Sequence, residues 1–429
     1  MHITGWTVAL AALGAVPAAL TQSRTVAWAW VIGVVVLALV DVWLAPPTHA
    51  VGVRREASGS VRLTQSTATR LTVANVGRRR ARGAVRDAWQ PSAGASGDRH
   101  AFALAPGETA TFRTMLRPTR RGDRHAGPVT VRTFGPLRLA GRQRSLEAPA
   151  RLRVLPEFAS RRHLPSRLVR LREIDGRTAV RLKGAGAEFD SLRDYVIGDD
   201  VRSIDWRGTA RRGEVVVRTY RPERDRRVVI ALDSARLSAA RVGDAPRLDA
   251  SIEAALLLAA LASHAGDRVQ ATAFDRAEQA RAASTGSRIV ATLADALAAV
   301  EPSLLEPDWP ALVRLVESRV SQRSLVVLLT TVDTSAMDSG MLEAVAALQR
   351  RHQVLVGSVE DPELGELMAG RADADAVYDA GAASRAMLER EAVATRLRQL
   401  GAEVVLALPD DLAPAVCDRY LALKAAGRL

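Results

Sequence analysis

Cysteine is almost absent from this chain of 429 residues, in which Cys417 is the one example. A single cysteine excludes an intramolecular disulfide and a zinc site built from several cysteines, so the composition fits a reducing compartment. Charge is nearly absent from the first 45 residues, where Arg24 and Asp41 are the charged side chains. An apolar stretch of this length indicates a lipid bilayer.

Two apolar segments, residues 5–22 and 26–45, are each close to the roughly 20 residues that a membrane-spanning helix needs. Because the link between them is so short, they are predicted to form an antiparallel hairpin with both ends on one side of the membrane. Arg54, Arg55 and the basic region beyond them place that side in the cytoplasm. The alternative is a cleaved signal peptide at residues 1–22, although Met1 to Thr4 contain no Lys or Arg. The second helix would still deliver the rest of the chain to the cytoplasm.

The charge of the chain, formally +13 in total, is unevenly distributed. Residues 51–230 hold 39 Lys and Arg against 18 Asp and Glu, whereas residues 231–429 hold 20 against 28. A basic region beside membrane helices fits anionic lipid or nucleic acid, and a solvated Arg-rich surface explains it without a ligand. The basic runs at residues 78–80 and 120–121 have no aromatic residues between them. The lipid bilayer is therefore the favoured partner, and no nucleic acid is expected.

The length of the chain predicts two or three structural units. Residues 50–155 show short alternating runs broken by Gly, Pro and Asn, which predict a small antiparallel β-sandwich-like domain. Residues 156–227 form a separate segment, and residues 228–429 alternate apolar strands with helices. That alternation predicts a doubly wound α/β domain with a parallel sheet covered on both faces. Its strands are predicted at residues 228–233, 269–274, 325–330, 354–359 and 404–408.

The strongest signal in the chain is a run of Gly, Asp, Arg and aromatic residues from Gly184 to Glu223. Paired carboxylates can act as general acid and base, but no His or Cys nucleophile lies nearby, and arginine partners keep acids ionised. We interpret the run as a salt-bridged cluster that holds the loop on the α/β domain, with Tyr195 and Trp206 as packing anchors. The ion pairs predicted from proximity are Arg193 with Asp194, Arg202 with Asp199 and Asp200, and Arg207 with Asp205.

This run resembles the signature of the bacterial domain of unknown function 58 family. The matching residues are Glu188, Phe189, Leu192, Arg193, Tyr195, Gly198, Asp199, Asp200, Arg202, Ile204, Asp205, Trp206, Ala210 and Arg211, with Tyr220 and Glu223 downstream. The layout of the whole chain is also similar to that family, whose members carry two membrane helices, a sandwich-like region, the signature and a von Willebrand factor A-like domain.

The resemblance implies a membrane-anchored scaffold or adaptor without catalysis of its own. It implies a multi-pass protein of the inner (plasma) membrane with cytoplasmic soluble domains, working with a MoxR-type AAA+ ATPase in the assembly or activation of client proteins. No Walker motif occurs in the sequence, so the ATPase is expected to be a partner. Two alternatives stay open: a carboxylate-dependent enzyme using Asp199, Asp200 and Asp205, and a Mg²⁺-dependent adhesin.

In von Willebrand A-like domains the first strand leads into an Asp-x-Ser-x-Ser loop whose oxygens bind Mg²⁺ at a metal-ion-dependent adhesion site. Asp233 keeps the first of these positions, but Ala235 and Leu237 replace both serines. Thr331 stands where a later strand would need Asp. The weaker candidates for further ligands are Asp333 and Thr285. The adhesion site is therefore degenerate, no metal or other cofactor is expected, and Asp233 is predicted to be a hydrogen-bonding loop residue.

Histidine offers no further metal site in the sequence. His264 and His352 lie in or beside predicted helices, without a second ligand at the spacing that metal binding requires. Both are therefore predicted to be surface residues.

Overall fold

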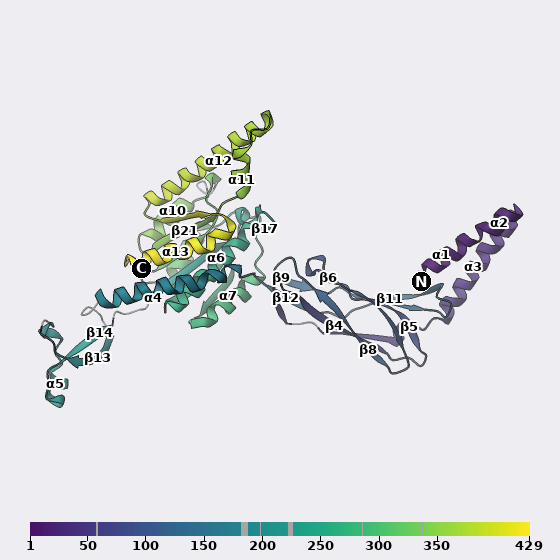
Figure 1. Ribbon diagram of the computed structural model, residues 1–429, viewed down its shortest axis with the longest axis horizontal. Helices are drawn as coiled ribbons and strands as arrows, with labels where there is room; N and C mark the ends of the chain where they lie inside the picture. Colours follow the sequence, from purple (N-terminus) through teal and green to yellow (C-terminus); the bar gives the residue numbers. More distant parts are fainter. Residues whose placement is uncertain (57–58, 182–187, 198, 222–225, 285, 336–338) are drawn as a thin grey trace. The chain divides into compact units, whose positions relative to one another are not determined.

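The computed structural model describes residues 1–56, 59–181, 188–197, 199–221, 226–284, 286–335 and 339–429 (Figure 1). The chain divides into two compact units, Met1–Glu157 and Phe158–Leu429. Each unit is described by itself.

The N-terminal helices are α1 (Gly5–Leu13), α2 (Ala15–Thr21) and α3 (Arg24–Leu44). Within the described residues, one helical stretch is long and apolar enough to cross a membrane: Arg24–Ala50, with a mean hydropathy of 2.2. The first predicted span corresponds to the shorter apolar stretch Gly5–Thr21, in which Gly14 separates α1 from α2. Length and composition therefore support one membrane span, and the second expected span is not supported by them.

The helices pack as an antiparallel pair, with α1 and α2 lying along α3. The indole Nε1 of Trp30 donates a hydrogen bond to the carbonyl oxygen of Leu10 at 2.9 Å. A β-carbon at Gly14 would overlap the Trp30 ring, so only glycine allows the two segments to approach this closely.

Asp41 connects helix α3 to the β-rich part of the first unit. Its carboxylate is fully buried and accepts hydrogen bonds from the backbone N–H groups of Leu137 and Leu139, each at 2.8 Å, and Ala140, at 3.0 Å. These residues lie at the turn between two strands, β10 (Val129–Phe134) and β11 (Ala140–Leu146). The presence of Asp41 in an otherwise apolar helix is therefore explained by hydrogen bonds to residues that are distant in the sequence.

The described residues of the β-rich part form three sheets, and because the two larger ones share a core, we call this part the β-sandwich. Their strand orders are β1-β11-β10-β5-β7, β2-β4-β8-β6 and β3-β12-β9, and all pairs are antiparallel except β3 with β12. The remaining strands are β1 (His2–Ile3), β2 (Val51–Glu56), β3 (Ser60–Arg62), β4 (Thr67–Asn75), β5 (Ala81–Arg86), β6 (Ala95–Ser96), β7 (Arg99–Leu104), β8 (Thr109–Leu116), β9 (Gly122–His125) and β12 (Arg151–Leu155). Alternate residues of the two larger sheets, such as Leu71, Val73, Phe102 and Val131, form their shared core.

A six-stranded sheet, in the order β19-β18-β15-β20-β21-β22, organises the second unit. Its strands are β15 (Arg227–Asp233), β18 (Arg268–Phe274), β19 (Glu278–Ser284), β20 (Leu325–Leu329), β21 (Gln353–Val359) and β22 (Glu403–Ala407). Five strands are parallel, and the edge strand β19 is antiparallel. Strands β18 and β19 lie on one side of β15, and the later strands β20, β21 and β22 lie on the other. The carboxyl ends of β15 and β20 therefore mark a topological switch point, where such sheets bind ligands.

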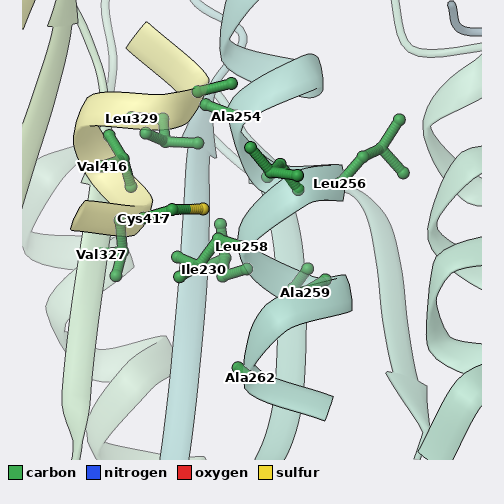
Figure 2. Close-up of a cluster of buried hydrophobic side chains, with 14 of the residues drawn as sticks. Ile230, Ala254, Leu256, Leu258, Ala259, Ala262, Val327, Leu329, Val416 and Cys417 are labelled. Atoms are coloured by element: carbon green, nitrogen blue, oxygen red, sulfur yellow. The ribbon is translucent and has the colours of Figure 1, made fainter. Parts of the chain in front are cut away.

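Helices cover both faces of this sheet (Figure 1). One face carries α4 (Leu164–Arg181), α6 (Arg247–His264), α7 (Ile289–Ala298) and α13 (Pro409–Ala425), and the other carries α8 (Trp309–Arg319), α10 (Met341–Gln349) and α12 (Ala374–Gln399), which follows α11 (Pro362–Ala369). Figure 2 shows Cys417 of α13 among Ile230, Leu258 and Val327. Burial raises the pKa of the Cys417 thiol, so the neutral thiol packs as a small apolar group.

The prediction of surface histidines is wrong for His352 and is confirmed for His264. His264 is exposed, with Nδ1 lying 2.7 Å from the carbonyl oxygen of Ala260. His352 is buried at the start of β21, and neither ring nitrogen has a hydrogen-bond partner among the described residues. Burial, assisted by the neighbouring Arg351, lowers the pKa of His352.

Because the folded state disfavours the His352 imidazolium, the free energy of unfolding is expected to fall as the pH drops through the unfolded-state pKa of about 6.5. His352→Leu removes this titration and two unpaired ring nitrogens. The variant is expected to lose less stability than the wild type between pH 8 and pH 5, as measured by urea unfolding of the detergent-solubilised chain. His125→Leu at an exposed position is the matched control. The same pH dependence in His352→Leu and the wild type would contradict the assignment.

Candidate functional site

The residues that match the family signature fold into a small hairpin unit, which we name the signature module (the described residues of 188–221). Strands β13 (Glu188–Asp194) and β14 (Val216–Arg221) pair antiparallel, from Glu188 opposite Arg221 to Asp194 opposite Val216. The connection between them carries a short 3-10 turn, η4 (Val201–Ser203), and helix α5 (Trp206–Arg212). A hairpin of this kind brings the two ends of the signature together.

Asp205 holds the connection to the hairpin. As the N-cap of α5, its carboxylate accepts a hydrogen bond from the backbone N–H of Gly208 at 2.7 Å, and its other oxygen accepts one from Arg218 Nε, also at 2.7 Å. The backbone hydrogen bond and the Arg218 guanidinium lower the pKa of Asp205. The predicted pairing with Arg207 is therefore wrong, because the hairpin places Arg218 of β14 beside the cap.

Asp199 and Asp200 also have structural roles in the turn. Arg193 of β13 donates to Asp199 Oδ1 at 2.6 Å, and the backbone N–H of Val196 donates to Asp199 Oδ2 at 2.9 Å. Asp200 caps η4 by accepting from the backbone N–H of Arg202 at 2.9 Å. The acidic residues are thus held by arginine or by backbone, as the cluster interpretation expects. Asp199 binds Arg193 instead of the predicted Arg202, whereas Asp200 binds Arg202 as predicted, but through its backbone N–H.

The other signature residues mostly shape the same module. The backbone of Glu188 and Phe189 lies in β13, Ile204 forms a β-bridge with Val217, and Leu192 packs against Gly208. Ala210 and Arg211 are exposed on α5, and Tyr195 is half-buried. The predicted residues that lie outside the described residues are Gly198, Glu223 and Thr285.

The tip of the signature module exposes apolar side chains. Ile197 is 97% exposed and Trp206 67% exposed, so the expectation that Trp206 is a packing anchor is wrong within the described structure. Val196 and Val201 are exposed beside them in the chain. Sequence reasoning missed these exposed apolar residues, although the apolar pair Val196 and Ile197 in a run of charged residues was a usable signal.

The second candidate site lies at the carboxyl end of β15, where Asp233 is buried. Asp233 Oδ2 accepts a hydrogen bond from Thr330 Oγ1 at 2.6 Å, and Oδ1 accepts one from the Ala235 backbone N–H at 2.8 Å. Burial raises the pKa of Asp233, and these two hydrogen bonds oppose the shift. Both carboxylate oxygens are engaged in holding the loop that follows the strand.

The residues around Asp233 do not fit a Mg²⁺ ion. Ala235 and Leu237 offer no side-chain oxygen, Thr331 is buried at the end of β20, and Asp333 accepts a hydrogen bond from Ser335 at 2.7 Å. Among the residues that the structure describes, no group of three or more His, Cys, Asp or Glu side chains is placed to hold a metal ion. Mg²⁺ requires several hard oxygen ligands at once, and this loop does not present them.

Together these features define a multi-domain protein of mixed α/β class, with one apolar helix near the N-terminus long enough to cross a membrane. Residues 191–402 match the model of the family described as "Protein of unknown function DUF58". The match covers most of the signature module and most of the six-stranded α/β domain, and it supports the resemblance based on the signature residues. Comparison with curated proteins gave no match.

Comparison with solved structures gave partial similarities to proteins of several kinds. A Salmonella α-2-macroglobulin mutant is 15% identical over 24% of this chain and 7% of its own length, with a TM-score of 0.19. The CARDB domain of a Pyrococcus furiosus protein is 15% identical over 24% of this chain and 91% of its own, with a TM-score of 0.18. A β-glucosidase from Listeria innocua is 13% identical over 23% of this chain and 16% of its own, with a TM-score of 0.16. Similarities of this size carry no functional argument.

Proposed function

We propose that this chain is a membrane-anchored, non-catalytic adaptor of the bacterial inner membrane, which presents its cytoplasmic domains to a MoxR-type AAA+ ATPase and to client proteins. The observation that supports this most directly is that the acidic and the apolar residues of the signature module have different roles. Its carboxylates, those of Asp199, Asp200 and Asp205, are occupied in holding the turn, whereas Ile197 and Trp206 are exposed. Large exposed apolar residues, aromatic ones especially, are typical of protein interfaces.

The α/β domain is proposed to be a von Willebrand A-like interaction module that works without a metal ion. Its strand order, with one antiparallel edge strand, and the match of residues 191–402 to the family model support this proposal. Since Asp233 is committed to Thr330 and Ala235, partner binding must rest on shape and surface chemistry instead of metal coordination. That reasoning favours the adaptor over the Mg²⁺-dependent adhesin.

The membrane anchor is proposed to be a hairpin that crosses the bilayer twice. Its start and its end both lie at the β-sandwich: the Thr4 backbone N–H donates to the Leu139 carbonyl at 3.0 Å, and Asp41 binds the backbone of the same turn. Both ends therefore lie on one side of the membrane, and the positive-inside rule makes that side the cytoplasm. Most of the helical surface between them is apolar and exposed, as a lipid environment requires.

The adaptor proposal is tested by measuring how tightly the full chain, in detergent, binds a MoxR-type ATPase of the same organism, with and without nucleotide. Replacing the apolar tip in the double variant Ile197→Ser with Trp206→Ala is expected to weaken binding by about 30-fold or more, since buried aromatic anchors dominate interface energies. Both positions are exposed, so the variant is expected to fold normally, which circular dichroism checks.

The matched control is the double variant Tyr378→Ala with Leu388→Ser on helix α12, where both side chains are also highly exposed. This control is expected to bind the ATPase like the wild type. Absence of wild-type binding in every nucleotide state would overturn the adaptor proposal. Equal weakening by both double variants would show that the signature module is not the contact surface.

A further inference from the structure

A loop of three consecutive arginines, residues 78–80, connects β4 to β5 and is held in a defined position. The buried Asn75 side chain donates hydrogen bonds to the carbonyl oxygens of Arg79, at 2.9 Å, and Leu104, at 3.0 Å, and its oxygen accepts from the Gly77 backbone N–H at 3.0 Å. The three arginine side chains are exposed. Asn75 therefore fixes the backbone of the loop while the guanidinium groups face solvent.

The arginine loop lies next to the exit of the membrane helix. The backbone N–H of Val76 donates to the carbonyl oxygen of Ala50 at 2.8 Å, and Ala50 ends the helical stretch Arg24–Ala50. A β-carbon at Gly77 would lie 2.7 Å from the Ala50 β-carbon. The loop is thus packed directly on the segment that leaves the membrane.

The turn between β10 and β11 lies at the same end of the sandwich. Gly83 near the start of β5 pairs with Thr133 near the end of β10, so the loop before β5 and the turn after β10 are neighbours. This turn binds Asp41 of α3 and exposes Arg138 and Leu137. A basic and an apolar side chain are therefore exposed side by side on the turn that holds the helix.

Aromatic residues mark the level of the membrane interface beside this end of the sandwich. Trp43, 77% exposed, lies at the end of α3, and Trp6, also exposed, lies at the start of α1. Tryptophan is enriched where the hydrocarbon region meets the headgroups. Glu108, an exposed acid at this end, accepts a hydrogen bond from the Ala105 backbone N–H at 2.7 Å, so its charge is partly engaged in its own turn.

We propose that the arginines at this end, Arg78, Arg79, Arg80 and Arg138, form a binding surface for the phosphate groups of anionic phospholipids in the leaflet where the hairpin emerges. These arginines lie on the loop that packs on Ala50 and on the turn that binds Asp41 of α3, which places them near headgroup level when the hairpin spans the bilayer. The exposed apolar residues Val76 and Leu137 lie beside them in the chain. We name these four arginines the arginine collar. The inference rests on the membrane insertion in the proposed function, and it adds a preference for one class of lipid.

The test compares how the full chain, reconstituted in vesicles of mixed phosphatidylglycerol and phosphatidylcholine, associates with spin-labelled versions of the two lipids. The wild type is expected to prefer phosphatidylglycerol by at least about 5-fold, because arginines near an anionic surface favour its binding. High salt should reduce the preference. In the triple variant Arg78→Gln, Arg79→Gln and Arg80→Gln, the preference is expected to fall to within about 2-fold of unity.

The matched control removes three exposed arginines from the opposite end of the sandwich. It is the triple variant Arg99→Gln, Arg117→Gln and Arg120→Gln, which has the same net charge change and should keep the wild-type preference. A wild type without preference, a collar variant that keeps it, or a control variant that loses it equally would overturn the proposal. Resistance to alkaline extraction from the vesicles separates the outcomes: loss of insertion contradicts the membrane anchor, whereas insertion without lipid preference contradicts the collar alone.

Discussion

Asp41→Leu is expected to detach helix α3 from the β-sandwich and to destabilise their contact by about 4 kcal/mol. The carboxylate accepts three backbone hydrogen bonds, from Leu137, Leu139 and Ala140. Each is worth about 1.5 kcal/mol when the acceptor is charged, and leucine leaves the three N–H groups buried without a partner. Amide hydrogen exchange at these three residues should accelerate by at least about 100-fold in the detergent-solubilised chain.

Two further variants separate this effect from a general weakening of the anchor. Val40→Ala changes an exposed apolar side chain one residue earlier, and it should leave exchange at the three amides unchanged. Asp41→Asn keeps the shape but halves the acceptor capacity of the side chain, so it should lie between the wild type and Asp41→Leu. Wild-type exchange rates in Asp41→Leu would mean that the carboxylate does not hold the turn.

Asp267→Ala is expected to lower the free energy of unfolding of the α/β domain by about 3–5 kcal/mol, the usual cost of leaving one member of a buried ion pair alone. Asp267, at the start of the β18 region, accepts hydrogen bonds from Tyr420 Oη at 2.6 Å and from Lys424 Nζ at 3.3 Å. All three side chains are buried. Urea unfolding, followed by tryptophan fluorescence, measures the loss.

The pH dependence of this loss of stability is expected to show that the unpaired Lys424 ammonium group causes it. Burial lowers the pKa of Lys424, and Asp267 opposes that shift, so removing Asp267 leaves the lysine favouring its neutral form. The unfolded state then binds more protons than the folded state, and the destabilisation should shrink as the pH rises toward about 10.4. The double variant Asp267→Ala with Lys424→Met should recover part of the lost stability. A loss of the same size at all pH values, without recovery in the double variant, would contradict this account.

The parallel strands of the α/β domain were readable from sequence because each is buried on both faces. The apolar runs at residues 228–233, 269–274 and 325–330 correspond to β15, β18 and β20 within one residue at each end. The edge strand β19 was missed, since its sequence is largely polar and alanine-rich. It is held by backbone pairing to β18 and by the ion pair of Glu278 with Arg319.

Helix α13 was also missed by the sequence analysis. Pro414 lies inside it, and proline ordinarily argues against a helix interior. The helix persists because Leu412, Val416 and Tyr420 are buried against the sheet. Packing energy, which is not visible in a local pattern, outweighs the local penalty.

The candidate site was likewise predictable from the sequence only in part. Local composition identified the signature residues and the loss of the serine ligands after Asp233, because those features depend on residue identity at fixed spacing. It paired Asp205 with Arg207, two residues away, whereas the hairpin pairs it with Arg218. It also predicted that Trp206 packs as an anchor, whereas the described structure leaves it exposed.

The sequence by itself determined the order of the parts: an uncharged apolar start, a basic β-rich middle and an acidic α/β end. Apolar periodicity and charge are local properties, so they can be read without knowing which segments meet. Only the tertiary structure decided why Asp41 stands in an apolar helix, which arginine each signature acid binds, and that residues 78–80 lie beside the membrane exit. These contacts join residues far apart in the chain, and strand pairing, which has no local signature, brings them together.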